Sequence, residues 1–169
     1  MNLCEIGTGS TDRKNATKDG KYPFYVRSKD ILKINHYEFD ETAIIIPGEG
    51  GIGEIFHFVK GKYTLHQITY RIHFTTDNVE TKFAYYYLSA NFKSFIMKKA
   101  VSATVTSIRK PMIQDFKIPV PPLPVQNEIV RILDTFTELI SELKAETAAR
   151  QKQYEYYRDL LLTFEEEFI

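Results

Sequence analysis

The sequence contains a single cysteine, Cys4, and no long apolar run. One thiol cannot close a disulfide within the chain and lacks the further cysteines of a zinc site, which indicates a reducing compartment. No uninterrupted apolar stretch approaches the roughly 18 residues of a membrane span, and residues 1–5 lack the apolar core of a signal peptide. We therefore expect a cytoplasmic protein that does not associate with a membrane.

Patterns that would support catalysis or metal binding are also missing. The histidines do not have a metal-binding spacing such as H-E-x-x-H, no G-x-S-x-G motif occurs, and the acidic residues are scattered. His57, His66 and His73 lie in or beside predicted strands, where a hydrogen-bonded structural histidine is the favoured interpretation. The fourth histidine of the chain is His36. The sequence therefore predicts no catalytic residue and no metal site.

The formal net charge is zero, with 22 basic and 22 acidic residues. Taken alone, this neutrality argues against nucleic-acid binding. The charges are unevenly distributed, however, because residues 1–124 carry a net charge of +5 and residues 125–169 carry −5. A mildly basic globular part is therefore followed by an acidic tail.

A proline-rich junction at residues 119–124 separates these two parts. Four of the seven prolines fall within these six residues, which predicts a stiff, extended segment. Pro124 is then expected in the first turn of a helix, where its missing N–H costs nothing. We assign residues 1–118 to a globular domain and residues 125–169 to one long helix.

The long helix carries an apolar stripe whose steps alternate between four and three residues. This period of 3.5 predicts a coiled-coil seam that requires a partner helix. The polar residues Thr147 and Arg150 occupy two consecutive positions of the stripe, and the apolar stripe continues in the same register beyond them. One buried polar layer of this kind can fix the register and orientation in which two helices pair. Packing of the stripe back onto the globular domain is the alternative. The seam positions are Ile129, Leu133, Phe136, Ile140, Leu143, Thr147, Arg150, Tyr154, Tyr157, Leu161, Phe164 and Phe168.

Residues 1–118 have the pattern of an α+β domain with a small mixed or antiparallel sheet and helices. Asp77 and Glu80 resemble a capping box ahead of a helix over residues 79–99. Short aromatic or β-branched runs between turn residues predict strands. These runs occupy residues 24–26, 43–46, 55–59 and 67–74.

The segment from Gly48 to Gly53 formally matches the dinucleotide-binding motif G-x-G-x-x-G after an apolar strand. That motif requires a helix directly afterwards, whereas the residues that follow are typical of a strand. A tight glycine turn between two strands is the favoured interpretation. Such a turn would also permit close approach to the backbone of a ligand.

Two polar, basic segments are candidates for contacts with phosphates. Residues 93–117 carry a local charge of +5 and include a run of small, hydroxylated residues, whereas residues 7–21 are expected to form a surface loop. A solvated surface is the alternative for both. The candidate DNA-binding residues are Arg13, Lys14, Lys18, Lys21, Thr104, Thr106, Ser107, Arg109 and Lys110.

The order of several short motifs resembles the target-recognition domain of type I restriction-modification specificity subunits. The most specific motif is Ile-Pro-x-Pro-Pro-Leu-x-x-Gln-x-x-Ile at residues 118–129, which leads into the long helix. The others are residues 5–11 (EIGTGST), 20–26 (GKYPFYV), 46–53 (IPGEGGIG), 66–67 (HQ), 107–110 (SIRK), 116–123 (FKIPVPPL) and 126–130 (QNEIV).

This resemblance implies a non-catalytic subunit that recognises one half of a bipartite sequence in double-stranded DNA. It also implies that methyltransferase subunits, which carry S-adenosylmethionine, and a restriction subunit dock on the scaffold. The family pattern usually has two recognition domains and two long helices, and this chain has one of each. We expect a half-length subunit, a C-terminal fragment or a product of truncation.

A half-length subunit can satisfy its seam by pairing with a second copy or with a second half-subunit through the long helix. Antiparallel pairing of two copies would place the two domains at opposite ends and predicts an inverted-repeat target. The alternative function is a protein-interaction scaffold that pairs through the helix without recognising DNA. An independent enzyme is the third, disfavoured hypothesis. The sequence assigns no residue to a particular base.

Overall fold

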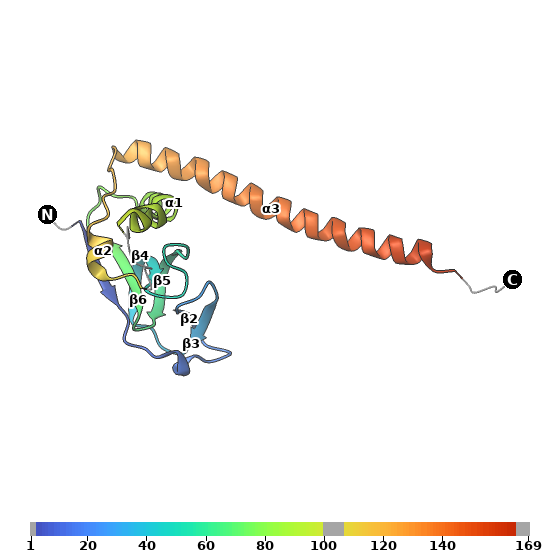
Figure 1. Cartoon of the computed structure of the whole chain (residues 1–169), viewed down its shortest axis with the longest axis horizontal. Helices are drawn as coiled ribbons and strands as arrows, with labels where there is room; N and C mark the ends of the chain where they lie inside the picture. Colours follow the sequence, from blue (N-terminus) through green and yellow to red (C-terminus); the bar gives the residue numbers. More distant parts are fainter. Residues whose placement is uncertain (1–2, 100–106, 165–169) are drawn as a thin grey trace. The chain divides into compact units, whose positions relative to one another are not determined.

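The structure is a computed structural model that describes residues 3–99 and 107–164 (Figure 1). The chain divides into two units, Met1–Asn127 and Glu128–Ile169, which we describe separately. The elements are β1 (Cys4–Thr8), η1 (Arg13–Asn15), β2 (Tyr22–Tyr25), β3 (Ile31–Ile34), β4 (Phe39–Pro47), β5 (His57–Leu65), β6 (Thr69–Phe74), α1 (Thr81–Lys99), α2 (Lys110–Gln114) and α3 (Leu123–Leu162).

The first unit is built on one mixed sheet with the strand order β1-β6-β4-β5-β2-β3. All neighbouring strands are antiparallel except β2 and β5, which are parallel. In the central strand β4, Ile44 and Ile46 pack into one apolar cluster, whereas Ala43 and Ile45 pack into another. Successive side chains of a strand point to opposite faces, so β4 is buried on both faces. The strand predicted at residues 43–46 is confirmed.

Helix α1 covers one face of the sheet, as Figure 1 shows. Ala84, Leu88, Phe92 and Ile96 follow one another at intervals of four and pack with Ile44 in the same buried cluster. Side chains at this spacing lie on one face of a helix. Complete burial of a Leu or Phe side chain stabilises the fold by roughly 1.5–3 kcal/mol. This layer of α1 on the sheet confirms the predicted α+β class.

The predicted capping box is wrong. Helix α1 begins at Thr81, so Asp77 lies outside its first turn and Glu80 directly precedes the helix. The Glu80 carboxylate accepts a hydrogen bond of 3.1 Å from the N–H of Lys82, and the Glu80 N–H donates to Gln126 at 2.8 Å. The helix start is therefore set by a contact with α3 rather than by Asp77.

Some predicted boundaries also differ from the structure. Strand β5 begins at His57 and extends to Leu65, and β6 begins at Thr69, since Gln67 and Ile68 form a turn. Strands β1 and β3 were not predicted at all. Residues 7–21, predicted as a surface loop, instead start within β1 and include η1.

Helix α3 begins at Leu123, which places Pro124 in its first turn as predicted. The first unit extends to Asn127 and therefore contains the proline-rich junction and the start of this helix. In the second unit the helix continues to Leu162 without a Gly or Pro. No helix in the described part of the chain is long and apolar enough to cross a membrane.

Candidate nucleic-acid interface

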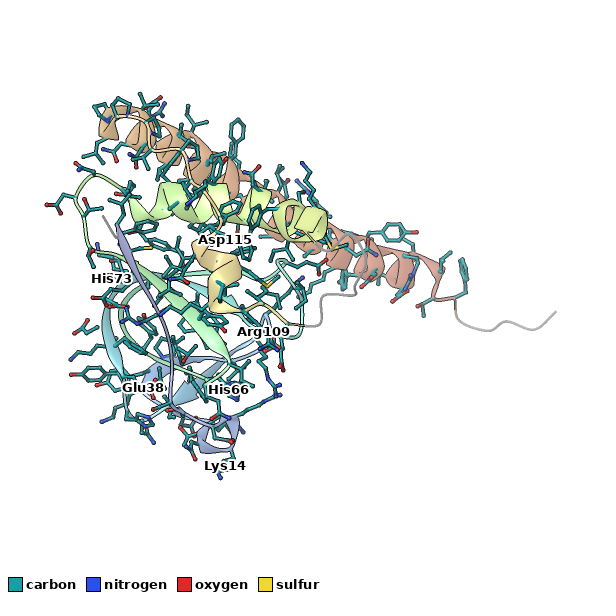
Figure 2. All side chains as sticks on the ribbon, turned by 60° about the vertical axis from the view of Figure 1, so that its left-hand side comes forward. Lys14, Glu38, His66, His73, Arg109 and Asp115 are labelled. Atoms are coloured by element: carbon teal, nitrogen blue, oxygen red, sulfur yellow. The ribbon has the colours of Figure 1, made fainter. Side chains whose placement is uncertain are left out.

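Backbone hydrogen bonds join four segments of the first unit that lie far apart in the sequence. Gln67 N–H donates to Thr11 C=O at 3.3 Å, and Gly48 N–H donates to Ile68 C=O at 2.9 Å. Ile108 N–H in turn donates to Gly48 C=O at 2.7 Å. We call residues 9–15, 48–51, 66–68 and 107–109 the loop face. Figure 2 shows Arg109, His66 and Lys14 following one another across this unit.

Glu38 organises the first segment of the loop face. Its Oε1 accepts hydrogen bonds from the N–H of Ser10 at 3.2 Å, from Ser10 Oγ at 2.6 Å and from Thr11 Oγ1 at 2.8 Å. Its Oε2 accepts a hydrogen bond of 3.3 Å from the N–H of Leu65. One carboxylate thereby ties the loop after β1 to the end of β5. The sequence offered no signal for this role, because Glu38 is one of several acidic residues near β4.

Asp12 then shapes the turn that presents two of the predicted contact residues. Its carboxylate accepts a hydrogen bond of 2.9 Å from the N–H of Lys14 and so caps the short helix η1. Arg13 and Lys14 are both exposed. Within residues 3–99 and 107–164, neither side chain forms an ion pair with a carboxylate. The turn therefore holds two cations at the loop face whose charges no described carboxylate neutralises.

Arg109 lies at the opposite end of the loop face, where it precedes helix α2 in an extended conformation. Arg109 and Lys110 are exposed, and neither forms an ion pair among the described residues. Lys110 also lines a cavity of about 820 Å³ between β1 and α2, together with Lys117. Ser107 is half-buried beside Arg109. Arg109 and Ser107 belong to the loop face, and Lys110 borders it.

The other predicted contact residues are not joined to this face. Lys18 and Lys21 are exposed on the segment before β2, where the N–H of Thr17 donates to the C=O of Lys33 at 2.8 Å. Their segment is therefore tied to β3. Thr104 and Thr106 lie outside the described residues.

Three other basic residues of the first unit, Arg27, Arg71 and Lys93, form ion pairs with carboxylates. Arg71 pairs with Glu41 at 2.8 Å and with Glu5 at 3.1 Å. Arg27 pairs with Glu49 at 2.8 Å, and Lys93 pairs with Glu54. These pairs distinguish structural cations from Arg13, Lys14 and Arg109, a distinction that composition cannot make.

The three histidines predicted to be structural each contact the backbone. His66 is buried, its Nδ1 accepts a hydrogen bond of 3.1 Å from the N–H of Ile68, and burial lowers its pKa, with a smaller contribution from Arg27. Burial likewise lowers the pKa of His57, which lies 3.4 Å from the C=O of Ser28. His73 Nδ1 lies 2.9 Å from the C=O of Thr42. Each ring is fixed by a backbone group.

The glycine segment forms a turn between β4 and β5, so the dinucleotide motif is excluded because no helix follows it. Gly50, Gly51 and Gly53 all have positive φ, a region that other residues adopt only with strain. A Cβ atom on Gly50 would lie 2.7 Å from the carbonyl oxygen of Arg27. Glycine is thus required where this turn packs against the segment that follows β2.

Gln126 is a second residue whose importance sequence reasoning missed, although it belongs to the most specific motif. Its side chain is 0% exposed, and its Oε1 accepts from the N–H of Glu80 at 2.8 Å. Its Nε2 donates to the C=O of Asn78 at 2.9 Å and to that of Pro121 at 2.7 Å. One amide therefore fastens the first turn of α3 to the start of α1.

In the second unit, most of the predicted seam is exposed along α3. The exposed fractions of its apolar side chains from Phe136 onward lie between 51% for Tyr157 and 76% for Phe164. Ile129 and Leu133 are partly buried, and Phe168 lies outside the described residues. Among the described residues, Thr147 and Arg150 form hydrogen bonds and ion pairs only within the helix itself.

Among the residues that the structure describes, no group of three or more His, Cys, Asp or Glu side chains could hold a metal ion. The loop face instead offers hydroxyl groups, backbone amides and cations. Such groups make the usual protein contacts to phosphates and base edges in DNA. This arrangement suits binding of a polyanion.

Comparison with known proteins agrees with this chemistry. A family model described as "Type I restriction modification DNA specificity domain" matches residues 2–150. The chain is 30% identical over 162 residues to the type I restriction enzyme EcoDI specificity subunit of Escherichia coli, which aligns with 96% of this chain and 35% of that subunit. It is 56% identical over 57 residues to the EcoR124I/EcoR124II specificity subunit of Escherichia coli, over 30% of this chain and 14% of that subunit.

A solved structure has the same fold. The S subunit of a type I restriction-modification system from M. genitalium superimposes with a TM-score of 0.70 at 19% identity, over 92% of this chain and 42% of that one. The chain thus spans between about a third and a half of the length of several relatives that align along most of it.

Proposed function

We propose, from the premise that this chain belongs to the family of type I restriction-modification DNA specificity domains, that it recognises one half of a bipartite sequence in double-stranded DNA. The chain has one sheet-based unit and one long helix, and it aligns with less than half of the relatives named above. A single unit of this kind accounts for a single half-site. A second copy or a second half-subunit would supply the other half.

The observation that carries the proposal is the pair of available cations at each end of a fixed loop face. Arg13 and Lys14 lie at one end, and Arg109 and Lys110 lie at or beside the other. Because the segments between them are joined by backbone hydrogen bonds, the cations keep a set spacing. Phosphate contacts of this kind fix the register of a protein on a duplex, while neighbouring side chains contact the bases.

In this proposal the chain itself performs no catalysis. Methyltransferase subunits that hold S-adenosylmethionine, and a restriction subunit, would dock on it and carry out the chemistry on the selected DNA. The relatives are specificity subunits of restriction enzymes, which supports such an assembly. The site of action would be the cytoplasm, where the DNA and these subunits meet.

Selection from a random duplex library tests the recognition step. The complex of this chain with the methyltransferase subunit of its own system would be mixed with the library, and the bound DNA would be sequenced. We expect enrichment of a defined half-site sequence. Bound DNA without any enriched sequence would refute recognition and favour the scaffold function.

The salt dependence of binding tests the assigned cations. The double replacement of Arg109 and Lys110 by alanine should reduce the slope of log affinity against log salt by about 0.9 for each phosphate that the variant no longer neutralises. The matched control replaces Lys144 and Lys152, two exposed lysines of α3 in the second unit, and should leave the slope unchanged. An unchanged slope in the first variant would remove both residues from the interface.

A further inference from the structure

The turn between β5 and β6 joins the two cationic ends of the loop face. At this turn the N–H of Gln67 donates to the C=O of Thr11 at 3.3 Å. The next residue accepts a hydrogen bond from the glycine segment, which in turn bonds the segment that ends at Arg109. The preceding residue, His66, lies between Lys14 and Arg109 in Figure 2. Gln67 therefore occupies a central position between the cations.

Hydrogen bonds hold the backbone of this turn on both sides of Gln67. Before it, the N–H of His66 donates to the C=O of Tyr25 at 2.9 Å. After it, the N–H of Ile68 donates to His66 Nδ1 at 3.1 Å, and the N–H of Thr69 donates to the C=O of His66 at 2.9 Å. Because His66 is buried, its ring is held in place. The side chain of Gln67 thus extends from a preorganised backbone position.

The turn itself does not require a glutamine. Turns favour Gly, Pro, Asn, Asp and Ser, each for a property of its backbone or of a short side chain. The side-chain acceptor that closes this turn belongs to His66, and Gln67 does not have a positive φ. Gln67 is exposed, and its amide forms no hydrogen bond with another residue that the structure describes. Its donor and acceptor groups are therefore available to a ligand.

Most other polar side chains of the loop face are already engaged with the protein. The engaged side chains are those of Ser10, Thr11, Asp12 and Glu49. Apart from the cations and the half-buried Ser107, two exposed amides remain, those of Asn15 and Gln67. Asn15 is the last residue of η1 and lies at one end of the face, whereas Gln67 lies between the two ends.

We propose that Gln67 recognises an adenine base in the half-site. A glutamine side chain carries an N–H donor and a C=O acceptor side by side. Adenine presents the matching pair in the major groove, since its N7 accepts and its N6 amino group donates. No other base offers an adjacent acceptor and donor on its own major-groove edge. This inference rests on the proposed function, in which the neighbouring cations hold the duplex by its phosphates.

His66 is the positioning residue for this contact. Its Nδ1 accepts from the N–H of Ile68, and burial lowers the pKa of His66, which favours the neutral ring that can accept. A protonated ring would carry an N–H on both nitrogens and could not accept this bond. The side chain of asparagine can accept from the N–H two residues further on. Asparagine can therefore replace His66 in this role, and alanine cannot.

Selection from a random duplex library tests the base contact, with each variant in complex with the methyltransferase subunit of its own system. Gln67→Ala should lose the preference at one A·T base pair of the half-site by roughly 5- to 150-fold, while the other positions stay enriched. Because no phosphate contact is removed, the slope of log affinity against log salt should not change. Gln67→Glu should shift the preference at the same position from adenine to cytosine, since a carboxylate accepts from the cytosine N4 amino group.

Asn15→Ala is the matched control, because it removes the other exposed amide of the loop face, and it should leave every position unchanged. A Gln67→Ala variant that keeps the native preference at all positions would overturn the inference. A loss at a G·C base pair, or an even loss over the whole half-site, would also overturn it, since an even loss indicates a phosphate contact. No enriched sequence with the native chain would instead refute the proposed function, and this inference with it.

Variants of His66 test its positioning role. The measured quantity is the ratio of the affinities for the native half-site and for the same duplex with that A·T base pair replaced. Because both duplexes compete for the same protein, a partly unfolded variant lowers both affinities equally and leaves the ratio intact. His66→Asn should keep this ratio, and His66→Ala should lower it towards the value for Gln67→Ala. Equal ratios for the two variants of His66 would exclude the positioning role.

Discussion

Replacement of Gln126 by alanine should lower the free energy of unfolding of the first unit by about 2–4 kcal/mol. The side chain is 0% exposed and bonds three backbone groups, the N–H of Glu80 and the C=O groups of Asn78 and Pro121. Each buried group left without a partner costs about 1–3 kcal/mol. Entry of water into the vacated space offsets part of this cost, since Asn78 is itself exposed.

The isosteric replacement of Gln126 by glutamate separates hydrogen bonding from packing. The carboxylate can still accept from the Glu80 N–H, but it cannot donate to the two carbonyl groups, and it places a charge in a buried site. We expect at least as large a loss of stability at neutral pH as for alanine. Part of it should be recovered in acid, where a protonated carboxyl regains one O–H donor.

Urea denaturation followed by near-ultraviolet circular dichroism measures both variants. Replacement of the neighbouring Asn127 by alanine is the matched control, because Asn127 is exposed in the same turn of α3 and alanine favours a helix. That control should change the unfolding free energy by no more than a few tenths of a kcal/mol. A Gln126→Ala variant that unfolds within about 0.5 kcal/mol of the native chain would refute the reasoning.

Three further predictions concern the first unit. Glu38→Gln should lower the unfolding free energy by about 1–2 kcal/mol, because an amide nitrogen would face N–H or O–H donors; an unchanged urea midpoint would contradict this. Gly50→Ala should cost more stability than Gly61→Ala, since both have positive φ but only the first new Cβ meets backbone, at Arg27; equal midpoints would argue against the packing of the turn. Burial lowers the pKa of His57 below its ordinary 6.5, so the unfolded chain binds more protons below that pH and stability should fall in acid. The fall in urea midpoint between pH 7.5 and 5.5 should be smaller for His57→Gln, and an equal fall would exclude His57 as a source.

The central elements of the fold could be predicted because their patterns are local. The apolar run at residues 43–46 indicates a strand that is buried on both faces, and α1 and α3 have apolar side chains at helical spacing. Strands β1 and β3 were missed because each is an edge strand with few buried side chains. Their conformation depends on pairing with β6 and β2, which no local pattern reveals.

The candidate site could be predicted only in part, for a similar reason. Composition identified Arg13, Lys14 and Arg109 as cations, but only the fold shows that backbone hydrogen bonds through Gln67, Ile68 and Gly48 join the segments that carry them. The role of Glu38 depends on contacts with Ser10 and Thr11, far from it in the sequence. Such contacts have no signature in one sequence.

Sequencing of methylated DNA tests the central claim most directly. DNA would be modified by this chain together with the methyltransferase subunit of its own system, and the methylated positions would be mapped. Recognition of one half-site by this chain predicts a bipartite target with a fixed spacer, absent when the chain is omitted, and an inverted repeat when a second copy reads the other half. Methylated positions without a shared sequence, or methylation that does not depend on the chain, would contradict the account.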